Sequence, residues 1–242
     1  MKYIAETQHN PFDVRPPCEQ FVPGFGDPNA HFHVVGDHPG VHGGLGTGIP
    51  FTDHPWSDRF FDTLQRGGLV QAYDLTAGTV DCRGTFFSYL CMCAPGSESA
   101  SESEPAPGSA STSVSDGEST LTTEEFATPT DDEYVTMEPY FDAELRAITA
   151  HVLLPVGERA TAHVLESYTA RAVDGDLDMD SFHASDLRGS GWLVIPLKDP
   201  SEWSERDGGT LADALADLLD SDYRQISDLG RFLPGEDPYF VR

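Results

Sequence analysis

Residues 31–52 read HFHVVGDHPGVHGGLGTGIPFT and hold the pattern that decides the fold. The apolar run His31–Val35 is bounded by turn-forming residues, which is typical of a short buried strand. The chain then breaks at residues 36–40 and passes through a glycine-rich loop to Phe51. In open α/β sheets, ligands bind in such loops, beyond the carboxyl ends of the strands. The stretch therefore predicts a functional loop that carries carboxylate, imidazole and aromatic groups.

Three further apolar runs predict strands, and segments with helical spacing separate them. In residues 55–67, for example, Trp56, Phe60 and Leu64 recur at helical intervals. The predicted strands are 31–35, 85–93, 151–156 and 191–197, and the predicted helices are 55–67, 133–149, 158–171 and 209–223. Strands that alternate with helices form parallel β-α-β units with right-handed crossovers. The prediction is an α/β fold, a three-layer α/β/α sandwich around a four-stranded, mainly parallel central sheet.

Residues 95–131 interrupt this pattern. They include eight acidic residues and no Lys or Arg, and they are rich in Ser, Thr, Pro, Ala and Gly. Such a segment cannot bury enough apolar surface to offset the entropy of ordering. We predict a disordered, acidic, Ser-rich insertion, a solvated spacer in preference to a phosphorylated regulatory segment. Residues 1–94 and 132–242 then form the two parts of one domain.

Acidic residues outnumber basic residues by 41 to 14, which gives a formal net charge of −27. Only Lys2 and Lys198 among the basic residues are lysines. Phosphate contacts need Lys and Arg, so this balance normally argues against a polyanion as partner. The acidic residues are spread along the whole chain, however, which favours adaptation to high salt. Such a surface stays hydrated and its repulsion is screened by the salt, so we interpret the chain as an acidic, halophilic protein.

The four cysteines, Cys18, Cys82, Cys91 and Cys93, form no CxxC pair, and their spacing argues against a zinc site. We predict buried, reduced thiols, as in a cytosolic protein. The N-terminal segment lacks the apolar run of a signal peptide, and no stretch has the length of a membrane span. A cytoplasmic monomer without membrane association is therefore expected.

The order of these motifs resembles that of the uracil-DNA glycosylase superfamily. Residues 36–40, Gly-Asp-His-Pro-Gly, and 50–52, Pro-Phe-Thr, stand where the iron–sulfur branch of that family has its first motif. Residues 41–44, Val-His-Gly-Gly, are similar to the Ala-His-Gly-Gly element of a sister branch. Residues 199–201, Asp-Pro-Ser, stand in the place of the second motif, His-Pro-Ser. The resemblance covers most of the chain apart from the acidic insertion.

The resemblance implies a glycosylase that hydrolyses the N-glycosidic bond of uracil, or of a related damaged base, flipped out of DNA. Asp37 would polarise water or balance the positive charge of the sugar, and His42 would donate a hydrogen bond to the departing base. Asp199 occupies the position of the second-motif imidazole. The other candidates are Gly36, Pro39, Phe51 and Tyr89 for base binding, with Phe51 stacking on the base, and Gly43, Gly44, Lys198 and Ser201 for DNA binding.

Departures from the family pattern bear directly on the chemistry. The iron–sulfur branch binds its cluster with four cysteines, whereas here the N-terminal CxxC is missing, Cys93 matches one ligand and Met137 stands where another would be. No cluster, metal or other cofactor is therefore predicted. Tyr89 lies near the position of the family's uracil-reading Asn, and Asp199 replaces the second-motif His. These changes leave open a catalytically degraded module of the same fold that binds nucleic acid or protein.

A metal-dependent hydrolase also remains open. Five of the nine His lie between His31 and His54, alongside Asp37 and Asp53. Neutral imidazole and carboxylate on strand-end loops bind Zn, Mn or Fe in such enzymes. No matching carboxylate cluster follows at a recognisable spacing, so this alternative ranks behind the other two.

Overall fold

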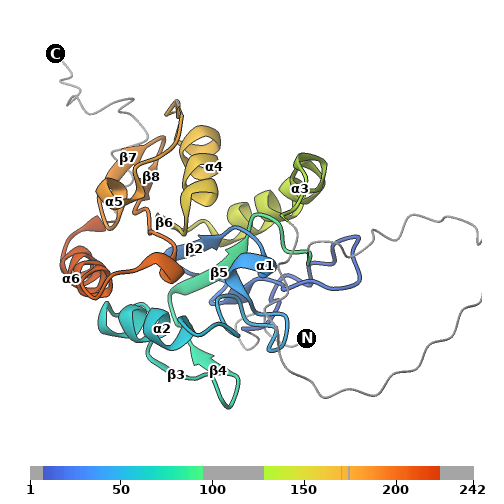
Figure 1. Cartoon of the computed structure of the whole chain (residues 1–242), viewed down its shortest axis with the longest axis horizontal. Coiled ribbons are helices and arrows are strands. Elements are labelled where there is room, and N and C mark those ends of the chain that lie inside the picture. Colours follow the sequence, from blue (N-terminus) through green and yellow to red (C-terminus); the bar gives the residue numbers. More distant parts are fainter. Residues whose placement is uncertain (1–7, 95–127, 170, 174, 224–242) are drawn as a thin grey trace, which may run out of the picture.

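A six-stranded sheet forms the centre of the protein (Figure 1). The structure is a computed structural model that describes residues 8–94, 128–169, 171–173 and 175–223. In spatial order the strands are β1 (Phe25–Gly26), β5 (Thr85–Tyr89), β2 (Phe32–Gly36), β6 (Val152–Pro155), β8 (Trp192–Val194) and β7 (Leu187–Gly189). The inner four run parallel, and β1 and β7 pair antiparallel at the two edges.

The predicted parallel sheet is confirmed, but it is wider than expected. The inner strands β5, β2, β6 and β8 overlap the four predicted runs, but β8 is shorter than predicted and covers only Trp192–Val194 of residues 191–197. The edge strands β1 and β7 were missed because two and three residues are too few to show a periodic pattern. The predicted strand 85–93 also ends early, at Tyr89.

Helices cover both faces of the sheet, as the three-layer prediction requires (Figure 1). Helices α2 (Ser57–Arg66) and α6 (Asp207–Leu219) pack on one face, and α3 (Asp131–Ile148) and α4 (Glu158–Tyr168) on the other. The shorter elements are α1 (Pro39–His42), α5 (Met179–Phe182), the 3-10 turn η2 (Pro200–Glu202), and the hairpin of β3 (Ala72–Asp74) and β4 (Thr79–Asp81). Of the helices that the structure describes, none is long and apolar enough to cross a bilayer.

Strand β2 is an inner strand of the sheet, with a parallel partner on each side. All five of its residues are buried. Val34 and Val35 point to opposite faces, as neighbours in a strand must, and each joins the core under one pair of helices. The carboxyl end of β2, and Asp37 directly after it, are thereby held at the middle of one edge of the fold.

Helix α3 begins at a capping box, which fixes the point where regular structure resumes. The Thr130 side chain accepts from the Glu133 N–H, and the Glu133 carboxylate accepts from the Thr130 N–H. Met137, Phe141, Leu145 and Ile148 recur at helical spacing in the sequence and form a buried apolar stripe along α3. Of the predicted insertion 95–131, residues 95–127 lie outside the described part of the chain. Residues 128–131 are described, and Asp131 belongs to α3.

The prediction of four reduced thiols is wrong. Cys18 and Cys93 form a disulfide, with Cα atoms 6.1 Å apart, that ties the N-terminal segment to the chain just beyond β5. Cys82 and Cys91 are free and buried. Local sequence patterns could not reveal the pairing, because its two cysteines are 75 residues apart in the chain.

Replacing Cys18 by serine is expected to lower the free energy of unfolding by about 2–4 kcal/mol, because a cross-link over a long loop restricts the unfolded chain. Thermal unfolding with and without a phosphine reductant measures the effect. The Tm of the wild-type protein should fall when reductant is added, whereas that of Cys18→Ser should stay where it is. A wild-type Tm that ignores the reductant and equals that of the variant would mean that no disulfide stabilises the fold.

Candidate active site

A cavity of about 200 Å³ opens where three neighbouring parallel strands, β2, β6 and β8, end. Asp37, His42 and Asp199 come together in it, although His42 and Asp199 are 157 residues apart in sequence. The lining consists of Asp37, Val41, His42, Val156, Gly157, Glu158, Arg159, Met179, Asp199 and Glu202. Ligands of open α/β sheets bind at this edge, so the cavity is the candidate active site.

Asp37 presents a carboxylate to the cavity from the turn that follows β2. The side chain is partly exposed, and its Oδ1 accepts a hydrogen bond of 2.5 Å from the Tyr134 hydroxyl. No described residue donates to Oδ2. One oxygen is thus fixed by the protein, and the other is left to interact with water or a ligand.

His42 links the two segments of the site. Its ring is buried, and Nδ1 accepts from the Asp37 N–H at 3.0 Å. The ring proton therefore lies on Nε2, which donates to Asp199 Oδ2 at 3.1 Å. The sequence predicts a hydrogen bond from His42 to the departing base, but in this arrangement the Nε2 proton is already donated to Asp199.

Asp199 is held as a carboxylate at the start of η2. Its Oδ1 accepts from the N–H and the hydroxyl of Ser201, at 2.8 and 2.5 Å. Burial favours the neutral acid, but the hydrogen bonds from His42 and Ser201 outweigh it and lower the pKa of Asp199 to about 2. Ser201, predicted to bind DNA, thus uses its hydroxyl to orient Asp199.

Phe51 and Tyr89, the predicted base-binding aromatics, lie behind His42 and are fully buried. The Phe51 ring packs against His42 at 5.2 Å between centroids. The Tyr89 hydroxyl accepts from the Phe51 N–H and donates to the carbonyl oxygens of His42 and Gly43. Both side chains pack against the inner side of the loop, and neither lines the cavity.

The glycines of the loop allow its segments to pack closely. At Gly43, φ is +77°, and an added Cβ would lie 1.8 Å from the Thr52 carbonyl oxygen. At Gly44, φ is +93°, and a Cβ would lie 2.6 Å from the Ile49 carbonyl oxygen. Backbone conformation and close packing therefore account for glycine at positions 43 and 44, without any contact to DNA.

Gly36 and Pro39 shape the backbone around Asp37. An added Cβ at Gly36 would lie 2.7 Å from the Tyr89 ring and 2.8 Å from His42 Nδ1. Pro39 is buried and opens α1, a helical turn within the predicted loop. Pro is favoured at this first helical position because its missing N–H is not needed there.

Lys198, predicted to contact phosphate, is engaged elsewhere. Its ammonium forms an ion pair with Asp180 and lies 3.8 Å from Asp207. The side chain is only 16% exposed and does not line the cavity. The structure therefore does not bring Lys198 together with Asp37.

Tyr134 and Arg159 belong to the site but were not predicted. Arg159 follows Gly157 at the end of β6, and strand-end position was the signal that would have identified it. Tyr134 lies on α3, 97 residues from Asp37 in the chain, and its place in an apolar helical stripe gave no such signal.

The sulfur-containing side chains beside α3 do not fit an iron–sulfur cluster. Cys18, Cys91, Cys93 and Met137 line one cavity of about 280 Å³. Cys18 and Cys93 are bonded to each other, and Cys93 Sγ lies 3.4 Å from the Met137 thioether. Fe–S clusters are held by thiolates, usually four, and Cys91 is the one free thiol among these side chains.

The histidines near the loop have separate roles. His33 donates to or accepts from Ser88 at 2.7 Å, and burial lowers its pKa to about 3. His38 caps α1 by accepting from the Gly40 N–H. In the described ranges, no group of three or more His, Cys, Asp or Glu side chains is arranged to hold a metal ion.

Comparisons with known proteins find relatives of this chain. A stretch of 87 residues is 36% identical to a type-5 uracil-DNA glycosylase of Thermus thermophilus and covers 35% of this chain. The match spans 37% of that enzyme, so the chain aligns with little more than a third of its length. The family model of the uracil DNA glycosylase superfamily matches residues 23–219, which include both segments of the candidate site. The chain therefore belongs to the uracil DNA glycosylase superfamily.

Proposed function

We propose that this protein is a DNA N-glycosylase that removes uracil, or a related damaged base, from DNA. The observation that carries the proposal is the convergence of Asp37, His42 and Asp199 on one cavity at the carboxyl ends of parallel strands. Membership of the superfamily and the similarity to a type-5 uracil-DNA glycosylase support the same reaction class.

In this proposal the carboxylate of Asp37 carries the chemistry. Cleavage of an N-glycosidic bond passes through an oxocarbenium-like sugar, which a nearby negative charge stabilises. Asp37 Oδ2 accepts no hydrogen bond from a described residue, which supports its proposed role of polarising water or balancing that charge. His42 and Asp199 act by holding the Asp37 backbone and η2 together across the cavity.

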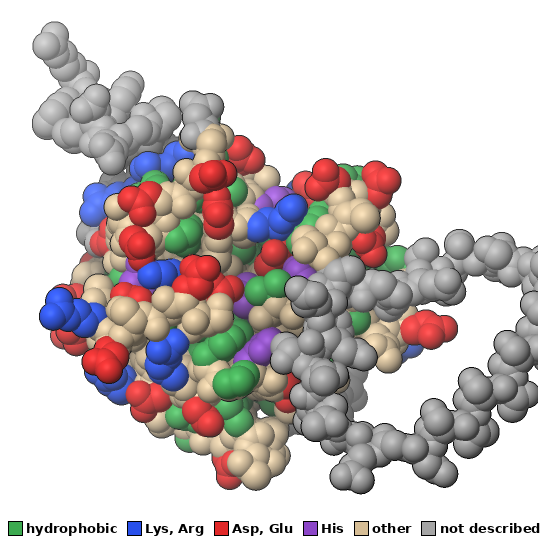
Figure 2. All heavy atoms as spheres, in the orientation of Figure 1, with side chains coloured by type: hydrophobic (Ala, Val, Ile, Leu, Met, Phe, Trp, Pro, Cys, Tyr) green, Lys and Arg blue, Asp and Glu red, His purple; other side chains and the backbone are tan. Residues whose placement is uncertain are grey.

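The proposed substrate is a polyanion, and the cavity makes an unusual interface for it. Glu158, Asp199 and Glu202 line it beside Asp37, and Arg159 is the one Lys or Arg in its lining. Figure 2 shows acidic and basic side chains interspersed over the face of the molecule that it draws, without one continuous basic patch. We therefore propose that few phosphates are contacted. We also propose that the protein acts at high salt, as a monomer and without a cofactor.

A second candidate is a binding module that has lost the reaction. It is favoured by Tyr89, which stands near the family's uracil-reading position and whose hydroxyl is used to hold the backbone of the loop. It is also favoured by Asp199, an ionised acceptor where the family has an imidazole donor.

Base release from a uracil-containing oligonucleotide in molar KCl separates the two candidates. The wild-type protein is expected to leave abasic sites, which alkali converts into strand breaks. Oligonucleotides with other deaminated or damaged bases, in single- and double-stranded form, extend the assay. A wild-type protein that is folded and binds DNA, but releases no base from any of them, would favour the non-catalytic module.

A further inference from the structure

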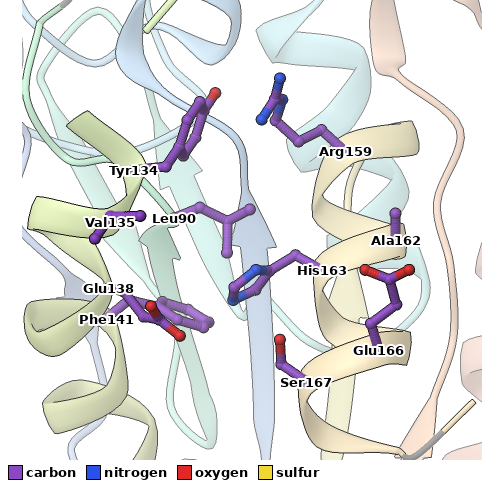
Figure 3. Close-up of a pocket in the computed structure, with 10 residues that line it drawn as sticks. All are labelled: Leu90, Tyr134, Val135, Glu138, Phe141, Arg159, Ala162, His163, Glu166 and Ser167. Atoms are coloured by element: carbon purple, nitrogen blue, oxygen red, sulfur yellow. The ribbon is translucent and has the colours of Figure 1, made fainter. Parts of the chain in front are cut away.

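Tyr134 reaches the candidate site from a helix on one face of the sheet. Its hydroxyl donates to Asp37 Oδ1, while its ring lies at one end of a cavity of about 360 Å³ between α3 and α4. Figure 3 shows Tyr134 and Arg159 together at this end, with Leu90 and His163 farther in. Tyr134 is therefore shared between this inter-helix cavity and the catalytic carboxylate.

Arg159 holds the Tyr134 ring in place. Its guanidinium lies over the ring, 4.4 Å from the centroid, and comes from the first turn of α4. A cation over an aromatic face is attracted by the ring quadrupole. Arg159 also lines the cavity of Asp37, so α3 and α4 meet beside the carboxylate through this stacked pair.

We propose that Tyr134 is a positioning residue for Asp37: its hydroxyl fixes Oδ1 and so turns Oδ2 toward the cavity. The inference rests on the proposed glycosylase function and adds a residue to it. A carboxylate in a turn has rotational freedom, and a single strong donor selects one rotamer.

The tyrosine hydroxyl can be removed without changing the packing of the ring. In Tyr134→Phe, kcat for base release is expected to fall roughly 10-fold with KM nearly unchanged, because an orienting hydrogen bond acts on the reacting group and not on DNA binding.

Tyr168→Phe is a matched control. The Tyr168 hydroxyl on α4 donates to Asp142 on α3, so this pair is a second tyrosine–aspartate hydrogen bond. Neither Tyr168 nor Asp142 lines the cavity of Asp37. This variant should keep the wild-type kcat and KM. Thermal unfolding of both variants shows whether a lower rate can be attributed to a lower stability.

Two further variants complete the test. In the double variant Asp37→Asn/Tyr134→Phe, the second change should have no further effect on the residual rate, since Tyr134 acts through Asp37. Arg159→Gln leaves the hydroxyl in place but frees the ring, and a smaller fall in kcat is expected. This variant also tests the inference if Tyr134→Phe does not fold.

The outcomes distinguish this inference from the proposed function. If the wild-type protein releases no base, both are overturned. If it is active and Tyr134→Phe matches Tyr168→Phe in kcat and KM, only the role of Tyr134 is overturned. Effects of Asp37→Asn and Tyr134→Phe that simply add would overturn it as well, because they would assign Tyr134 an action independent of Asp37.

Discussion

Replacing Asp37 by asparagine is expected to reduce the rate of base release by at least about 100-fold, the effect of losing a positioned acid–base group. A neutral amide can neither take a proton from water nor balance the charge of an oxocarbenium-like sugar. Asparagine keeps the size of the side chain, and its amide oxygen still accepts from Tyr134, so the fold should be retained. Single-turnover base release in molar KCl measures the change without a contribution from product release.

Asp142→Asn provides the matched control for this experiment. Asp142 accepts from the Tyr168 hydroxyl just as Asp37 accepts from Tyr134, and it does not line the cavity. This variant loses one negative charge, as Asp37→Asn does, and should keep a rate close to that of the wild type. Equal rates for the two variants would mean that Asp37 has no catalytic role and that its carboxylate only stabilises the turn after β2.

The elements that could be predicted from sequence are those whose pattern is local. β2 and β8 are apolar runs between turn residues, and α3 repeats buried residues at helical spacing. The edge strands β1 and β7 are set by pairing with β5 and β8, which their own few residues do not encode. The Cys18–Cys93 disulfide depends in the same way on which segments meet in the folded chain.

The candidate site was predicted in part for one physical reason: parallel strands end at the same edge. That rule brings Asp37 and Asp199 together across the sheet without knowledge of the intervening chain. The rule does not predict which hydrogen-bond partner a given side chain will have. The pairing of Lys198 with Asp180 and the reach of Tyr134 to Asp37 are set by helix packing, so residue type alone could not identify them.

A second large effect is expected at Glu144, a carboxylate buried in the core on α3. Its side chain is fully buried, and neither carboxylate oxygen has a well-formed hydrogen bond. Burial raises its pKa from 4.5 to about 8, and the Gly24 N–H nearby lowers it only in part. In the folded protein Glu144 is therefore neutral below about pH 8, whereas in the unfolded chain its side chain ionises above pH 4.5.

The sign of the pH dependence follows from these two values. The contribution of Glu144 to stability is fully present below pH 4.5 and is lost as pH rises to about 8. Each pH unit in this window lowers the free energy of unfolding by about 1.4 kcal/mol, so the full loss is on the order of 5 kcal/mol. His33 acts in the opposite direction, since burial lowers its pKa from 6.5 to about 3 and its contribution is lost as pH falls through that range.

Glu144→Gln isolates the carboxylate from all other titrating groups. The variant cannot ionise, so its free energy of unfolding should rise relative to that of the wild type at every step from pH 4.5 to 8. Denaturant unfolding across this range in molar KCl gives the difference, and Glu138→Gln, an exposed change on the same helix, is the control. The slope of the difference against pH decides the matter, because a packing defect of glutamine shifts all values equally and leaves the slope intact. Parallel curves for wild type and Glu144→Gln would mean that the folded protein ionises Glu144 as readily as the unfolded chain does.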